Sequence, residues 1–129
     1  MIFSIVIYSA PFTTQSASSA LRFSKTLIDE GHKIYRLFFY SDGVHNASSL
    51  TISPQDEESL QAEWDTLIKV NKLDSVVCVS SALKRGVLGN EEAERQGLAG
   101  HSLRDSSEIS GLGQFIDAYI HSDRVISFG

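Results

Sequence analysis

The chain contains one cysteine, Cys78, at the point where an apolar run ends. Residues 75–79 are typical of a strand, and residues 80–86 predict a turn into a short helix. A thiol in this position is suited to nucleophilic chemistry, because the N–H groups and dipole of a following helix lower the pKa of a cysteine. Lys84 and Arg85 either add positive potential near the sulfur or form a solvated helix end.

A second interpretation of Cys78 is structural, because free cysteine is among the most buried residue types and packs as a small hydrophobe. The sequence pattern leaves both interpretations open. If Cys78 reacts, the chain offers no second cysteine to resolve a disulfide. The sulfur must then pass to another molecule, or the thiol must attack a substrate that water or another acceptor later releases.

A cysteine hydrolase would also need a histidine base. His45 is the best candidate, because its polar loop follows a predicted strand and should lie at the same sheet edge as Cys78; the alternative is an exposed loop histidine. His32 and His121 are more simply partners of helix ends, and His101 lies in a loop rich in Gly and Ser. Scattered histidines without a CxxC or HExxH motif predict no metal site.

Other familiar sites are missing from the sequence. The chain has no GxGxxG after its first strand, no P-loop and no GxSxG elbow, so we expect no cofactor. Its formal net charge of -5 argues against tight binding of nucleic acid by this chain alone. No apolar stretch approaches the ~20 residues of a membrane span, and residues 1–10 lack the basic region of a signal peptide. A lone cysteine fits the reducing cytoplasm, so we expect a cytoplasmic protein without a membrane segment.

Strand and helix patterns alternate along the 129 residues. The predicted strands are 2–8, 33–40, 75–79 and 124–128, with a fifth near 108–109. The predicted helices are 16–30, one that starts at Pro54 with Ser53 as its cap, 81–85, 90–95 and 111–121. This alternation predicts a single α/β domain over residues 1–129, with a mostly parallel sheet of about five strands in a three-layer α/β/α arrangement.

The elements around the predicted site follow from this arrangement. In parallel α/β sheets the binding crevice lies outside the carboxyl ends of the strands. Residues 9–15, residues 41–53 and the turn after Cys78 should meet at that edge. Helix faces should supply the core, including Trp64, Phe115 and the other apolar residues of the last helix. Those residues are Leu112, Ile116, Tyr119 and Ile120.

Six segments, in this order and spacing, closely resemble the DsrE/DsrF-like sulfurtransferase family, and within it the TusD-type subunits that carry a cysteine. They are residues 14–32 (TQSASSALRFSKTLIDEGH), 38–50 (FFYSDGVHNASSL), 77–87 (VCVSSALKRGV), 91–100 (EEAERQGLAG), 109–115 (ISGLGQF) and 123–129 (DRVISFG). The resemblance extends over essentially the whole chain and carries over Cys78 as the catalytic residue. It assigns no role to His45.

The resemblance implies a sulfur relay in the cytoplasm. Cys78 would accept a persulfide sulfur from a TusA-like donor and pass it to a TusE-like acceptor, for 2-thiolation of the wobble uridine of tRNA. The chain would work with TusB-like and TusC-like paralogues in a dimer of heterotrimers. Three alternatives stay open: a relay in dissimilatory sulfur oxidation, a structural subunit whose cysteine is buried, and, more remotely, the cysteine hydrolase.

Overall fold

A parallel sheet forms the centre of the computed structural model, which describes residues 1–55 and 57–129. Within these residues five strands pair in the order β4-β3-β2-β1-β5, and every pair is parallel. The strands are β1 (Ile2–Ile7), β2 (Lys33–Phe39), β3 (Ser75–Cys78), β4 (Glu108–Ser110) and β5 (Arg124–Phe128). The predicted α/β class is confirmed, including the short strand near residue 108.

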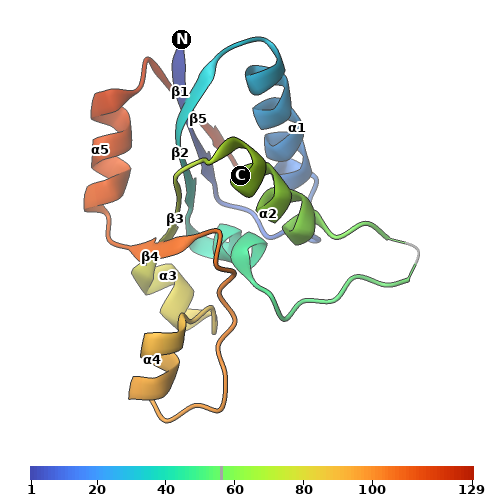
Figure 1. Cartoon of the computed structure of the whole chain (residues 1–129), viewed down its shortest axis with the longest axis vertical. Coiled ribbons are helices and arrows are strands. Elements are labelled where there is room, and N and C mark those ends of the chain that lie inside the picture. The colour runs from blue at the N-terminus through green and yellow to red at the C-terminus, as the bar shows by residue number, and fades with distance from the viewer. Residues whose placement is uncertain (56) are drawn as a thin grey trace.

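The helices lie on both faces of this sheet and at one end of it. They are α1 (Ser16–Asp29), the 3₁₀ helix η1 (Ser41–Ala47), α2 (Leu60–Asn71), α3 (Val79–Lys84), α4 (Asn90–Arg95) and α5 (Gly113–His121). Figure 1 shows α1 and α2 on one face and α5 on the other, while α3 and α4 follow the carboxyl end of β3. The predicted three-layer arrangement is therefore confirmed.

The central strands are buried on both faces, as their continuous apolar runs require. Side chains alternate across the sheet, so neighbouring residues enter different clusters. Ile5, Ile7 and Val77 belong to the larger cluster, under α1 and α2. Cys78 belongs to the smaller cluster on the opposite face, together with Val6, Phe38 and Val76, against which Phe115 of α5 packs.

The start of α2 differs from the prediction. The helix begins at Leu60, and Ser59 caps it by accepting a hydrogen bond from the Ala62 backbone at 3.1 Å. The predicted cap, Ser53, and the predicted first residue, Pro54, both lie before the helix; residue 56, in the predicted first turn, is outside the described residues. The apolar periodicity begins only at Leu60, so the residues before it have no face to bury against the sheet.

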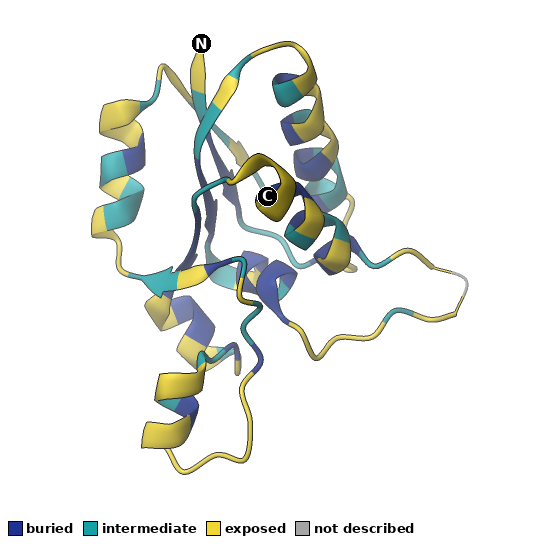
Figure 2. Cartoon of the chain, in the orientation of Figure 1, coloured by how far each residue is buried: buried dark blue, intermediate teal, exposed yellow. Residues whose placement is uncertain are grey.

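The last helix also differs from the expectation of a core face. Along α5 only Ala118 is buried, and Phe115 is half-buried. Four apolar side chains at the start of α5 and along it are exposed: Leu112, Ile116, Tyr119 and Ile120. Figure 2 shows this helix largely in the colours of exposed and half-buried residues. The apolar stripe of α5 is wider than the part of the helix that packs on β1, β2 and β5, so some of its apolar side chains stay exposed. By contrast, Trp64 is buried as predicted.

None of the helices in the described parts of the chain has both the length and the apolar character that a bilayer-spanning segment needs.

Candidate functional site

Cys78 is the last residue of β3 and the residue that caps α3. Its thiol is free, and it lies at the carboxyl end of the sheet, where a parallel α/β fold places its binding crevice. On the side away from β2, Ser110 of β4 is its register partner. The sequence-based prediction of a cysteine between a strand end and a helix start is therefore confirmed in position.

The thiol is covered in the isolated chain. Cys78 is 1% exposed and contacts the smaller cluster, with Tyr40 and Phe115 packed against that cluster. The Cys78 sulfur nevertheless lies close to the surface, because it is 3.5 Å from the hydroxyl oxygen of Ser80, which is an exposed residue.

Two serines of α3 favour the ionised form of this thiol. Burial is the largest single influence on the pKa of Cys78 and raises it, but the hydroxyl and backbone N–H groups of Ser80 and Ser81 together outweigh burial, so the pKa is lowered. Because α3 has only six residues, its dipole is small, and these individual donors matter more. The sequence pattern identified the turn but not these hydroxyl groups.

Ser81 is oriented by the neighbouring segment η1. The Ser41 backbone N–H donates to the Ser81 hydroxyl oxygen at 3.0 Å, which leaves the Ser81 proton free to be donated elsewhere. Ser41 adopts this position with a φ of 54°, in the left-handed region that a non-glycine residue rarely occupies. Gly43 lets η1 approach β1, since a Cβ there would lie 1.9 Å from the Ile7 carbonyl oxygen.

Arg85 links η1 to α3 through three hydrogen bonds. Its Nε donates to the Asp42 carboxylate at 2.7 Å, its Nη1 donates to the Ser81 carbonyl at 3.2 Å, and its Nη2 donates to the Ser41 hydroxyl at 3.4 Å. The hydrogen bond from Arg85 lowers the pKa of Asp42. Lys84 is exposed at the end of α3. The basic pair therefore divides into a positioning arginine and a solvated lysine.

The histidines do not form a catalytic pair with the thiol. His45 lies in η1 at the predicted edge, but among the hydrogen bonds of the described residues the Cys78 sulfur has one to Ser80 and none to His45. The Nδ1 atom of His32 accepts a hydrogen bond from the Met1 ammonium group, and His121 forms a hydrogen bond with Asp117 of its own helix. His101 is exposed. The hydrolase interpretation thus gains no support.

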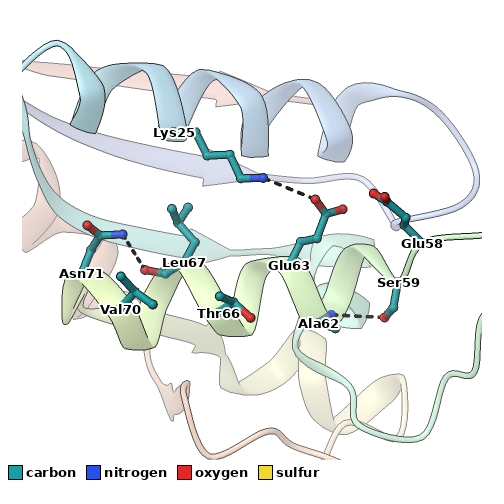
Figure 3. Close-up of a pocket in the computed structure, with 9 residues that line it drawn as sticks. All are labelled: Lys25, Glu58, Ser59, Ala62, Glu63, Thr66, Leu67, Val70 and Asn71. Carbon is teal, nitrogen blue, oxygen red and sulfur yellow. Dashed lines mark hydrogen bonds and ion pairs between the residues drawn. The ribbon is translucent and has the colours of Figure 1, made fainter.

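Two of the cavities in the described residues have helices in their walls. The larger, about 490 Å³, lies between α1 and α2, where Lys25 and Glu63 form an ion pair at 3.3 Å (Figure 3). It includes no residue from the strand ends. The second, about 400 Å³, is lined by residues of α3, α4 and β4, including Val79, and Cys78 is not part of its lining. No group of three potential ligands for a metal ion occurs within residues 1–55 and 57–129.

Several known proteins are similar to this chain over nearly its whole length. The model of the DsrE/DsrF-like family matches residues 1–128. The sulfurtransferase TusD homolog of Pseudomonas aeruginosa is 49% identical over 129 residues, which are 100% of this chain and 98% of that protein. Sulfurtransferase TusD of Cronobacter sakazakii is 41% identical over 128 residues, covering 99% and 100% of the two chains.

Two further similarities widen the comparison. The DsrE protein of Allochromatium vinosum is 40% identical over 129 residues, covering 100% of this chain and 99% of its own. The crystal structure of the ychN protein from E. coli superposes with a TM-score of 0.75 at 20% identity, covering 99% of each chain. That structure supports the fold alone.

Proposed function

Since the chain belongs to the DsrE/DsrF-like family and is a sulfurtransferase, we propose that Cys78 accepts a sulfur atom as a persulfide and passes it to a second protein. The observation that carries this proposal is a lone thiol at the carboxyl edge of the sheet whose pKa is lowered by Ser80 and Ser81. Thiolate is the form that attacks sulfur, so a lowered pKa favours transfer at neutral pH.

The chemistry is two displacements without net oxidation. The Cys78 thiolate attacks the outer sulfur of a donor persulfide; a bond from the Cys78 sulfur to that outer sulfur forms, and the bond to the donor's cysteine breaks. The donor leaves as a thiolate and takes up the proton that Cys78 gave up. A thiolate of the acceptor then attacks the outer sulfur on Cys78 in the same way, and Cys78 returns to its starting state.

The surroundings of Cys78 suit a persulfide intermediate. A persulfide is an anion near neutral pH, and the N–H and hydroxyl donors of Ser80 and Ser81 can stabilise it as they do the thiolate. The smaller cluster packs around the sulfur in the isolated chain and limits its contact with water. A single cysteine also prevents an internal disulfide from discharging it.

The pathway we propose is 2-thiolation of the wobble uridine of tRNA, with a TusA-like donor and a TusE-like acceptor in the cytoplasm. Identities of 49% and 41% to proteins named TusD support it. The exposed apolar face of α5 supports the proposal that the chain acts in a complex with TusB-like and TusC-like paralogues. A helix with apolar residues on most sides is usually covered by another part of the protein or by a partner subunit. The family match over residues 1–128 supports one domain.

A reconstituted transfer tests the proposal. With radiolabelled sulfur on the TusA-like protein, label should reach the TusE-like protein in the presence of the complex containing this chain. Cys78→Ser should abolish that transfer while leaving the melting temperature and assembly of the complex unchanged, because the substitution is small. Equal transfer by the wild-type and Cys78→Ser complexes would contradict a relay through this thiol.

Two observations favour other functions. The 1% exposure of Cys78 favours a structural subunit. Treatment of the assembled native complex with iodoacetamide tests this alternative, because a cysteine that is only structural should stay unmodified. The 40% identity to DsrE favours the same relay within dissimilatory sulfur oxidation. In that case deletion of the gene would leave thiolated tRNA at its normal level.

A further inference from the structure

One arginine side chain connects the two segments that meet beyond the carboxyl end of β3. Arg85 directly follows α3 and donates hydrogen bonds in three directions. Two of these bonds go to η1, at the Asp42 carboxylate and the Ser41 hydroxyl, and the third goes to the Ser81 carbonyl of α3. A planar guanidinium holds several acceptors in fixed directions, which an ammonium group does not. Arg85 therefore fixes where η1 lies relative to α3.

The same arginine holds both partners of the hydrogen bond that orients the Ser81 hydroxyl. In that bond the Ser41 N–H donates to the Ser81 hydroxyl oxygen at 3.0 Å. The Nη2 atom of Arg85 lies 3.4 Å from the hydroxyl of Ser41, and its Nη1 atom lies 3.2 Å from the carbonyl of Ser81. Loss of the arginine side chain would therefore loosen the two residues on which this bond depends.

The backbone of η1 is strained at this junction. Ser41 has a φ of 54°, in the left-handed region that side chains other than glycine rarely adopt. Such a conformation persists only where its surroundings hold it, and it is found most often at functional sites. The bonds of Ser41 to Arg85 and to Ser81 are contacts that hold it here.

The position of the first turn of α3 matters to the sulfur because that turn carries the donors. Cys78 caps α3, and the hydroxyl and backbone N–H groups of Ser80 and Ser81 lower the pKa of its thiol. Hydrogen bonds weaken steeply when the donor turns away from its acceptor. Because Cys78 is 1% exposed, water is poorly placed to replace a donor that is lost. A shift of this turn would therefore disfavour the thiolate.

We propose that Asp42 and Arg85 are positioning residues for the sulfur transfer at Cys78. Their ion pair holds η1 against the first turn of α3, and this keeps the serine donors directed at the sulfur. The two residues act through the serines and not by contact with a substrate. The proposal rests on the proposed function in that transfer by Cys78 is the activity served, whereas the effect on the thiol is independent of it.

The ion pair suits this role because it is charged at neutral pH and contributes little to the fold as a whole. The hydrogen bond from Arg85 lowers the pKa of Asp42, and the nearby His45 acts in the same direction, so the carboxylate stays ionised. The side chains of Arg85 and Asp42 are 27% and 63% exposed, and exposed ion pairs add little stability. Variants of the pair should therefore fold.

The test compares Arg85→Met with Lys84→Met in the assembled complex. Both variants lose one positive charge at the end of α3, but Lys84 is exposed and lies outside the three hydrogen bonds of Arg85. The thiolate of Cys78 is titrated by its ultraviolet absorbance, which needs no reagent to reach the covered thiol. The Cys78→Ser complex is subtracted at each pH. This removes the signals of all other groups, including Tyr8 and Tyr40, which pack against the cluster of Cys78.

Arg85→Met should raise the pKa of Cys78 by about half a unit, so that below the midpoint roughly threefold less thiolate is present. Transfer from the persulfidated TusA-like protein should slow by a similar factor at the same pH, while Lys84→Met should match the wild type. Asp42→Ala should give a smaller shift in the same direction, because Arg85 keeps its bonds to the serines. Arg85→Met/Asp42→Ala should shift no further than Arg85→Met alone, because both changes break one link.

Different results overturn the positioning proposal and the proposed function. Identical titrations of Arg85→Met and the wild type would show that the arginine does not act on the thiol, and would leave the relay intact. Equal shifts in Arg85→Met and Lys84→Met would make the effect one of charge and not of position. If Arg85→Met fails to assemble, Asp42→Ala decides, and an unchanged titration overturns the proposal. A wild-type Cys78 that never gains sulfur would contradict the relay, whereas the predicted shift would still support the positioning role.

Discussion

At the scale of single residues, the chemistry of the site depends on how two serines balance the burial of Cys78. Burial opposes the thiolate, and the donors of Ser80 and Ser81 favour it. Ser81 can act as a donor because its oxygen already accepts the Ser41 N–H at 3.0 Å. The orientation of one hydroxyl group therefore links the backbone of η1 to the reactivity of the thiol.

Ser81→Ala should raise the pKa of Cys78, because it removes a hydroxyl donor and leaves the burial unchanged. At a given neutral pH less thiolate is then present, so iodoacetamide should modify the protein more slowly, and the pH profile of that rate should move to higher pH. Ser18→Ala, a matched change within α1, should leave the profile in place. An unchanged profile in Ser81→Ala would show that this hydroxyl does not act on the thiol.

Sequence reasoning identified part of this site. It placed Cys78 at the strand end, because the apolar run stops there and a turn follows. It did not determine the exposure of the thiol, since an apolar run around a cysteine is the same whether the sulfur is open or covered. It also did not identify Ser81, whose role depends on a left-handed backbone at Ser41 and on contact between segments 40 residues apart.

At the scale of elements, α5 is held over the sheet by one buried arginine. Arg36 of β2 is 7% exposed and donates to the Gln114 carbonyl at 2.8 Å and to the Asp117 carboxylate at 3.0 Å. It also bonds Asp74, which precedes β3, at 2.7 Å. Phe115 lies on this helix and packs on the cluster that contains Cys78, so the arginine helps to fix the cover of the thiol.

Arg36→Met should lower the free energy of unfolding by about 2 kcal/mol. A fully buried ion pair that loses one partner costs roughly 3–5 kcal/mol, and the partial exposure of both carboxylates reduces that figure. Arg22→Met, at an exposed position on α1, is the control and should change stability little. Chemical denaturation measures both variants, and an equal effect in the two would remove Arg36 as the anchor of α5.

The same elements show what sequence patterns predict well. The strands were predictable because buried parallel strands need continuous apolar runs, and β1 and β2 have them. The start of α2 was not predictable from the pattern, because a favourable cap at Ser53 is outweighed by packing that begins only at Leu60. The exposed face of α5 was not predictable either, since periodicity identifies an apolar stripe but not what covers it.

At the scale of the whole molecule, the thiol and an uncovered helix face lie on the same side of the sheet. The thiol is at the carboxyl edge, and α5 carries an uncovered apolar face on the side of the sheet to which Cys78 points. A subunit that covers α5 would therefore lie on the side of the sheet that carries the thiol.

The mass of the peptide that contains Cys78, measured after incubation with the persulfidated TusA-like protein, decides whether this thiol accepts sulfur. The wild-type chain, assembled with its TusB-like and TusC-like paralogues, is alkylated after the reaction, digested and measured by mass spectrometry. We predict that the peptide containing Cys78 gains the mass of one sulfur atom and loses it again on addition of the TusE-like protein. A peptide that gains no sulfur, with all partners present, would contradict it.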